Sequence, residues 1–195
     1  MARSGELWVW VGSWCGLAEA SDGRDTDHVG EEEALAQSGT EGERAMPVFR
    51  GVTELALDAK GRFAVPARYR DGLTAESGPR LVLTADPSRC LLLYPLAAWE
   101  PIQARLMALS SFDERIRGLQ RLLVGHADDV EIDTAGRILV PPALRRYASL
   151  DKRVVLVGQG RKFELWDDAA WAARTARAIA FDGGGLPPEL DGFSL

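Results

Sequence analysis

The stretch Leu57-Asp58-Ala59-Lys60-Gly61-Arg62-Phe63-Ala64-Val65-Pro66 returns, little changed, as Ile132-Asp133-Thr134-Ala135-Gly136-Arg137-Ile138-Leu139-Val140-Pro141. Both copies follow one pattern: an apolar residue, Asp, two variable residues, Gly-Arg, an apolar residue, a variable residue and Val-Pro. The chain therefore contains an internal duplication. A small sequence unit that occurs twice predicts a pseudo-symmetric body that presents the same arginine-bearing loop on two sides.

The duplication extends beyond these loops. Residues 91–99 align with residues 163–171 at an offset of 72 positions, whereas the two loops are offset by 75. The copies therefore differ by a small change of length in the segment between, and a loop tolerates such a change best.

Each loop is expected to reverse the chain. An Asp side chain accepts hydrogen bonds from the N–H groups of its own turn, and Gly supplies the positive φ that closes it. Residues 52–57 and 62–65 have strand composition. Together they predict a β-hairpin with Asp58 at its entry and Arg62 at its exit, and residues 133–141 predict its twin.

Further strands are expected after each hairpin. A short helix fits the residues that follow directly, and the apolar runs that come next suit strands buried on both faces. We expect strand 80–85 to pair with 90–94 around a turn at 86–88, and strand 153–157 to pair with 162–166 around a turn at 158–161.

Two helices are expected between the copies and one near the end. Apolar residues at spacings of three and four over 99–109 indicate the first, whose stripe packs on the sheet or against a neighbouring subunit. The second has a capping-box pattern at 111–114 and Gly125 where a C-terminal cap belongs. The last is expected over 167–180, with Asp167 as its N-cap.

The charge is unevenly divided along the chain. Residues 1–45 hold 3 basic and 10 acidic groups, whereas residues 46–195 hold 20 basic and 19 acidic groups, within a formal net charge of −6. The acidity of the whole chain therefore does not argue against nucleic-acid binding. Because the near-neutral part lacks a large basic footprint, any such binding must use a few charges many times.

Residues 1–45 differ in kind from the rest. An apolar patch at 7–11 is followed by a run rich in Gly, Ser, Asp and Glu without periodicity, which predicts a disordered extension. A secretory signal is the weaker interpretation, since Glu6 spoils the basic flank, and the patch is too short to span a bilayer. Because Met46 directly precedes the first residues with a folded pattern, we expect Met46 to be the true start.

Cysteine and histidine usage gives no sign of a metal or cofactor. Cys15 lies in the front segment and Cys90 in an apolar run, which predicts a core position for Cys90 and no disulfide framework. His28 and His126 share no metal-ligand spacing with each other or with the cysteines. We expect no cofactor, and a structural role for His126 at a helix-to-strand junction.

Arg62 and Arg137 are the strongest candidates for recognition. Each leaves a tight turn, from which a planar guanidinium can reach phosphate oxygens or the O6/N7 edge of guanine. Lys60 adds a positive charge at the tip of the first loop, where the second copy has Ala135. We therefore expect the first loop to bind phosphate better.

The same residues admit other interpretations. Asp58 and Asp133 lie four residues before the two arginines, so each pair can form an ion pair that merely braces its turn. An enzyme is the weakest class, because it needs a pocket that holds His126 together with one of these pairs. The main alternative to DNA binding is an oligomeric protein whose loops bind an acidic protein partner.

An ordered set of motifs resembles the MraZ family of bacterial transcriptional regulators. It comprises the two Asp-x-x-Gly-Arg loops and the segments 46–51, 90–95, 121–127 and 162–166. The match covers essentially everything from Met46 onward, and residues 1–45 have no counterpart in it. A single loop would be weak support, but this ordered set is highly specific.

The resemblance implies an α+β fold. Two tandem AbrB-like swapped-hairpin units, 52–99 and 128–171, would form a pseudo-symmetric β-barrel-like core with peripheral helices. Residues 100–127 would supply the connecting helices, and 172–195 the end of the last helix and a flexible tail.

The resemblance also implies a function. Family members are sequence-specific DNA-binding regulators, usually repressors, of the division and cell-wall gene cluster. They act as ring-shaped homo-oligomers on short direct repeats of double-stranded DNA in their own promoter region, in the cytoplasm and associated with the nucleoid, without a membrane or a catalytic step. The family's Asp-x-x-x-Arg motif places the DNA-binding candidates here at Asp58, Lys60, Arg62, Asp133, Arg137 and, in the first segment, Arg50.

Overall fold

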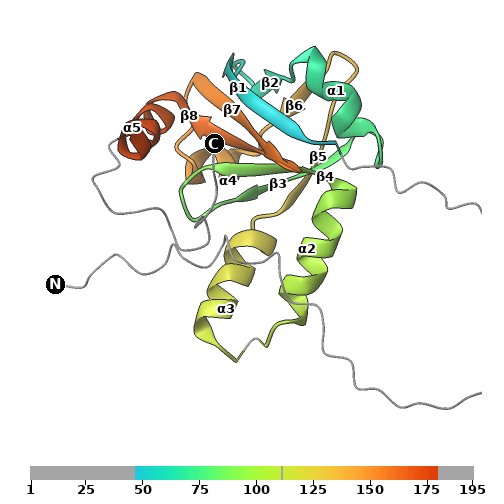
Figure 1. Cartoon of the computed structure of the whole chain (residues 1–195), viewed down its shortest axis with the longest axis vertical. Helices are drawn as coiled ribbons and strands as arrows, with labels where there is room; N and C mark the ends of the chain where they lie inside the picture. Colours follow the sequence, from blue (N-terminus) through green and yellow to red (C-terminus); the bar gives the residue numbers. More distant parts are fainter. Residues whose placement is uncertain (1–46, 111, 180–195) are drawn as a thin grey trace, which may run out of the picture. The chain divides into compact units, whose positions relative to one another are not determined.

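The structure is a computed structural model that describes residues 47–110 and 112–179. Our interpretations of the front segment, of Met46 and of the tail after residue 179 lie outside these residues. Figure 1 shows the described part as a β-sheet body with helices at its periphery. The chain therefore has the α+β class that was expected.

The elements of the two copies follow the same order. The first copy contains β1 (Phe49–Ala56), β2 (Arg62–Ala64), α1 (Ala67–Thr74), β3 (Arg80–Ala85), β4 (Leu91–Pro95) and α2 (Leu96–Ala108). The second copy contains β5 (Asp128–Glu131), β6 (Arg137–Leu139), α4 (Pro142–Tyr147), β7 (Arg153–Gly160), β8 (Lys162–Asp167) and α5 (Asp168–Ile179). Between them lie α3 (Glu114–Leu119) and a π-helical turn, η1 (Gln120–Val124).

The strands form a six-stranded sheet in the order β1-β7-β8-β4-β3-β5 and a separate two-stranded ribbon, β2-β6. The predicted pairing of each strand with its neighbour across the Asp-x-x-Gly turn is wrong. The turns do reverse the chain, but β1 pairs along its whole length with β7 and β2 pairs with β6. The chemistry of the turn determines only that the chain reverses. Because β2 has just three residues, long-range packing decides which strand it pairs with.

Every pairing of β1, β2, β5 and β6 crosses from one copy to the other. β1 pairs with β7 and, in the same way, β5 pairs with β3, while β4 and β8 meet in the middle of the sheet. Among the described residues, β1 and β5 are the two ends of the six-stranded order. Closure of this sheet into a barrel stays a prediction.

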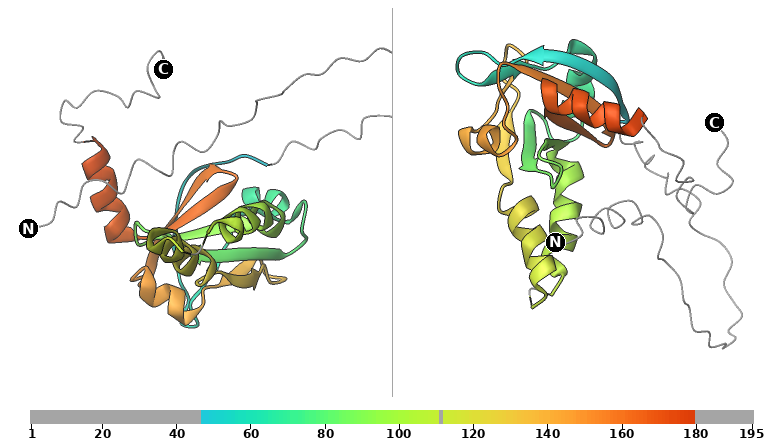
Figure 2. Two further views of the ribbon diagram at one scale, coloured as in Figure 1. Left: turned by 90° about the horizontal axis from the view of Figure 1, so that it is seen from below. Right: turned by 90° about the vertical axis from the view of Figure 1, so that its left-hand side faces the viewer.

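The long strands are buried on both faces, as their apolar runs predicted. Along β7, Val154 and Leu156 face one apolar cluster and Val155 and Val157 face another. The first cluster joins the sheet to β2, β6, α1 and α4, and the second joins it to α2 and η1. The sheet is thus the middle layer, and Figure 2 shows helices on different sides of it. Cys90 is fully buried, as expected.

The helices α2 and α3 with η1 form a hairpin that extends from the sheet (Figure 1). Gln120 holds its two arms together, because its Nε2 donates to the carbonyl oxygen of Leu106 at 2.8 Å. The N-cap of α3 is Asp113, whose Oδ1 accepts from the N–H of Arg115 at 2.7 Å. The capping box expected at 111–114 therefore has its cap two residues later than its first position, and residue 111 lies outside the described residues.

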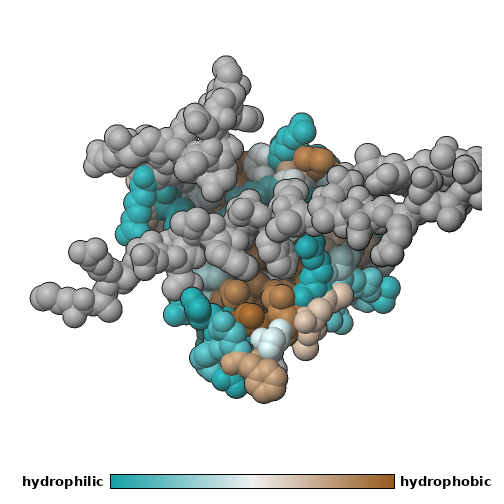
Figure 3. Space-filling model, turned by 60° about the horizontal axis from the view of Figure 1, so that its bottom comes forward, coloured by the Kyte–Doolittle hydropathy of each residue, from teal (hydrophilic) through white to brown (hydrophobic). Residues whose placement is uncertain are grey.

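Two large apolar side chains are exposed at the end of this hairpin. Met107 is 58% exposed and Phe112 is 96% exposed. Figure 3 shows apolar side chains gathered at this end of the molecule. Exposed apolar groups that cluster in this way mark interaction surfaces.

The other predicted helix caps and turns were mostly correct. Asp167 caps α5, since its Oδ1 accepts from the N–H of Ala169 at 3.0 Å, and Gly125 caps η1. The turn expected at 158–161 is shorter, because β7 continues to Gly160.

Candidate nucleic-acid interface

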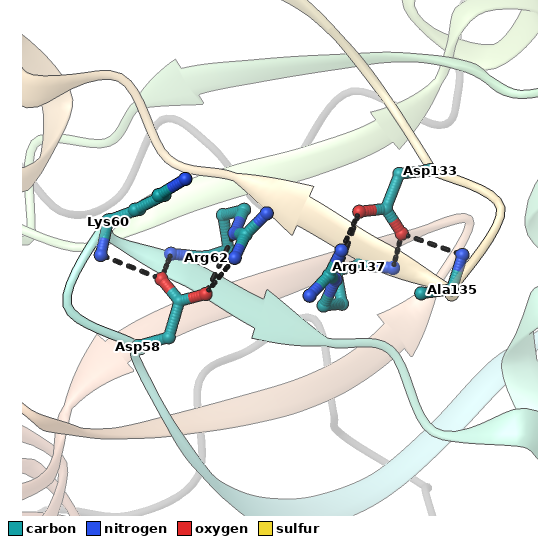
Figure 4. A network of polar contacts seen from close by, with 6 residues as sticks. All are labelled: Asp58, Lys60, Arg62, Asp133, Ala135 and Arg137. Carbon is teal, nitrogen blue, oxygen red and sulfur yellow. Dashed lines mark hydrogen bonds and ion pairs between the residues drawn. The ribbon is translucent and has the colours of Figure 1, made fainter.

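The first loop is organised by Asp58. Its Oδ1 accepts from the backbone N–H groups of Lys60 and Arg62, both at 2.9 Å, and its Oδ2 accepts from Nε and Nη2 of Arg62, both at 2.7 Å. Gly61 closes the turn at φ +82°, where a residue with a side chain is strained. The carboxylate therefore fixes the backbone of the turn and one edge of the guanidinium together (Figure 4).

The second loop repeats this arrangement. Asp133 Oδ1 accepts from the N–H groups of Ala135 and Arg137 at 2.9 Å, and Oδ2 accepts from Nε and Nη2 of Arg137 at 2.9 and 2.8 Å. Gly136 has φ +74°. The same local sequence has thus built the same local geometry twice, as the duplication predicted.

The β2-β6 ribbon brings both loops to one surface, so the expected presentation of the loops on two sides of the body is wrong. Arg62 lies opposite Leu139, and Arg137 lies opposite Ala64, so the two arginines are diagonal neighbours on the same face. Diagonal neighbours in an antiparallel pair are roughly 7–8 Å apart. Phe63 and Ile138 alternate with these positions and are buried. The ribbon therefore turns its apolar residues to the core and both Asp-Arg pairs outward (Figure 4).

The ion pairs stabilise the turns and leave part of each arginine side chain accessible. The side chains of Arg62 and Arg137 remain 26% and 38% exposed. Guanidinium has five N–H donors, and the carboxylate takes only the edge formed by Nε and Nη2. The edge formed by Nη1 and the second N–H of Nη2 stays outside the ion pair, and that end-on edge is the one that suits guanine O6 and N7. Bracing and recognition are thus compatible.

Both carboxyl groups are held in the charged form. The backbone N–H of Arg62, the Arg62 guanidinium and the N–H of Lys60 keep the pKa of Asp58 at about 2, below its ordinary value. The side-chain and then the backbone hydrogen bonds of Arg137 likewise lower the pKa of Asp133. Each aspartate therefore remains a fixed anionic support for its arginine at neutral pH.

Sequence reasoning missed two arginines that belong to these loops. A Cβ atom at Gly61 would overlap the guanidinium of Arg145 on α4, and a Cβ at Gly136 would overlap that of Arg70 on α1. Each loop is therefore covered by a helix of the other copy. The available signal was an arginine that follows each loop glycine by nine residues, in Gly61–Arg70 and Gly136–Arg145.

The remaining candidate residues, Lys60 and Arg50, lie outside the two Asp-Arg pairs. Lys60 stands exposed at the tip of the first loop, and the corresponding Ala135 is also exposed. Arg50 lies near the far end of β1, more than about 20 Å along the strand from Asp58. The structure therefore does not bring Arg50 to the first loop.

Within the described residues, nothing gathers three potential metal ligands, and no helix is long and apolar enough to cross a membrane. His126 follows η1, where its Nδ1 lies 3.2 Å from the carbonyl oxygen of Arg121 and its ring contacts Tyr147. This position fits the expected junction between helix and strand.

The sequence of the chain matches a known protein family. A family model described as "MraZ protein, putative antitoxin-like" matches residues 48–122 and again residues 123–182. The chain belongs to the MraZ family. The resemblance noted in the motifs is therefore confirmed, and both Asp-Arg loops lie within the matched MraZ segments.

Individual MraZ relatives match over their full length. A protein named "Transcriptional regulator MraZ" from Methylobacillus flagellatus is 60% identical over 148 residues, which are 76% of this chain and 100% of the relative. Proteins of the same name from Thiobacillus denitrificans and Nitrosomonas europaea are 57% and 55% identical over the same shares.

Proposed function

We propose that this chain is a transcriptional regulator that binds double-stranded DNA in a sequence-specific manner. The name of its relatives supports the first part of this proposal. The observation that carries the second part is the outward face of the β2-β6 ribbon. It presents two guanidiniums side by side, and each is held by its own aspartate.

This face has the chemistry of a base-reading surface. A two-stranded ribbon is narrow enough to enter the major groove, and Arg is the usual side chain that contacts guanine there. Because Asp58 and Asp133 fix their arginines before binding, little side-chain freedom is lost when DNA is contacted. The exposed Leu139 on the same face offers an apolar contact for a thymine methyl group.

We infer that the two copies, 52–99 and 128–171, are related by a pseudo-twofold axis. The strand order supports this, because exchanging each strand with its counterpart in the other copy reverses the order into itself. The register supports it too: Arg62 opposite Leu139 corresponds to Arg137 opposite Ala64. Such an axis passes through the ribbon and gives one chain two similar DNA contacts.

A single chain carries few charges on this face, so we propose that binding is strengthened by assembly into a ring. The exposed Met107 and Phe112 at the end of the α2–α3 hairpin supply an apolar contact for a neighbouring subunit. A rigid ring that carries many loops binds repeated DNA boxes at high effective concentration. Short direct repeats upstream of its own gene, in the division and cell-wall gene cluster, are the proposed target, with repression as the outcome and the nucleoid in the cytoplasm as the location.

Fluorescence anisotropy of the full chain on the DNA upstream of its own gene tests the proposal. Wild type should bind this duplex more tightly than a scrambled one, and Arg62→Ala together with Arg137→Ala should remove most of the difference while the assembly stays intact by size-exclusion chromatography. Arg62→Lys is the matched control, because it keeps the charge but loses the fork. Unchanged binding by the double variant would refute the assignment, and retention of an acidic protein instead of DNA would favour the alternative function.

A further inference from the structure

Arg145 brings a second guanidinium to the first loop from the other copy. Its Nε, Cζ and Nη1 atoms fill the space over Gly61 in which a Cβ would stand. Gly61 lies between Lys60 and Arg62 in the chain. Three cationic residues therefore belong to or cover one short turn, and of these three only Arg62 forms an ion pair in the described part of the chain.

The charge of Arg145 is not compensated by the protein. None of the ion pairs found within residues 47–110 and 112–179 includes it. Its Nε is buried without a hydrogen-bond partner. The Nη groups are therefore the atoms of this guanidinium that an outside ligand can contact. A guanidinium that the protein does not pair with a carboxylate can form strong charge-assisted hydrogen bonds with a phosphate.

Arg70 occupies the corresponding position in the other copy and differs in this respect. It covers Gly136, but its Nε donates to the carbonyl oxygen of Val65 at 2.9 Å. The tip of the loop that it covers has Ala135 in place of a lysine. Arg70 is thus anchored beside a loop with less charge, whereas Arg145 stands unanchored beside Lys60.

We propose that Arg145 and Lys60 form a phosphate-binding site on the first loop, built jointly by the two copies, whose ligand is a backbone phosphate of double-stranded DNA. This inference rests on the proposed DNA-binding function and extends it. The contact is made by the Nη groups of Arg145, because its Nε is buried. Phosphate held at this point fixes the register of the duplex, and Arg62 then reads the base edge.

The salt dependence of binding tests the site. The full chain, Arg145→Gln, Arg145→Lys and Arg70→Gln are titrated onto the upstream duplex and a scrambled duplex at several salt concentrations. Arg145→Gln should weaken both complexes by the same factor and reduce the slope of log affinity against log salt by about 0.9 for each first loop that engages DNA. Arg145→Lys should keep most of the slope. Arg70→Gln should lower the melting temperature and change the slope less.

Three results would overturn the site while leaving DNA binding established. These are an unchanged slope in Arg145→Gln, a loss confined to the upstream duplex, and an equal loss of slope in Arg70→Gln. Lys60→Gln probes the same site at an exposed position, so the test stands even if Arg145→Gln does not fold, and an unchanged slope there counts equally against it. If wild type shows no salt-dependent binding to either duplex, the proposed function fails as well.

Discussion

The two loops of this chain agree in their internal geometry and differ in their surroundings. In both, an aspartate accepts two backbone N–H groups through one oxygen and a guanidinium through the other, at 2.7–2.9 Å. Around the first loop lie Lys60 and the uncompensated Arg145, whereas Ala135 and the anchored Arg70 lie around the second. A duplication thus repeats what five residues build among themselves, while the neighbours of each copy are free to diverge. We therefore expect the loops to contribute unequally.

The largest difference is expected between Arg62→Ala and Arg137→Ala. A bidentate arginine-guanine contact is worth about 1–3 kcal/mol of discrimination, so Arg62→Ala should lower affinity for the upstream duplex by about 5-fold to 150-fold. Arg137→Ala should lower it less, because its loop holds the duplex with fewer charges. Anisotropy titrations at one salt concentration measure both. Equal losses would show that the loops are equivalent.

For stability we expect the opposite order, so that replacing the glycine of the second loop costs more than replacing that of the first. Both have positive φ, and a side chain there costs about 1–2 kcal/mol. Gly136→Ala should lose about 1 kcal/mol more than Gly61→Ala, because it displaces the Arg70 side chain that is hydrogen-bonded to Val65. Urea unfolding gives both free energies of unfolding. A greater loss in Gly61→Ala would mean that Arg145 is the better anchored of the two.

Acid should weaken both loops. The pKa of Asp58 is lowered from 3.8 to about 2 in the folded protein, so its contribution to stability is present above pH 3.8 and is lost as the pH falls towards 2. The lowered pKa of Asp133 acts in the same direction. Asp58→Asn should therefore flatten the fall in the denaturation midpoint between pH 4 and pH 2. An equally steep fall in this variant would place the acid-sensitive groups elsewhere.

The smallest effect is expected from exchanging the two loop tips. The double variant Lys60→Ala and Ala135→Lys keeps the net charge and moves one cation from the first loop to the second. If phosphate is bound by Lys60 together with Arg145, affinity should fall by a few-fold at low salt, as expected for one exposed cation. Unchanged affinity would indicate that only the total charge of the ribbon matters.

Much of the fold followed from local patterns. The Asp-x-x-Gly turns, the buried strands β3, β4, β7 and β8 and the caps at Asp167 and Gly125 were predicted from residues close together in the chain. The pairing of β1 with β2 was wrong for the opposite reason, since the strand that β1 joins lies about a hundred residues further on. The N-cap of α3 was predicted at Ser111 instead of Asp113, because serine and aspartate are both residue types that favour an N-cap.

The candidate site shows the same division. Asp58, Arg62, Asp133 and Arg137 were predicted from the repeated motif, and the ribbon indeed gathers them. Arg50 was grouped with them on family resemblance alone, and the length of β1 separates it from the first loop. Arg70 and Arg145 were missed, because a helix that follows one loop packs on the other.

By itself, the sequence determined two braced turns, each with an arginine at its exit, because an aspartate and a glycine with positive φ act within five residues of chain. Only the tertiary structure decided which strands pair, that both arginines share one face, and which guanidinium covers which glycine. Those outcomes depend on burying the apolar residues of two copies in common cores, and this requirement joins segments that no local pattern connects.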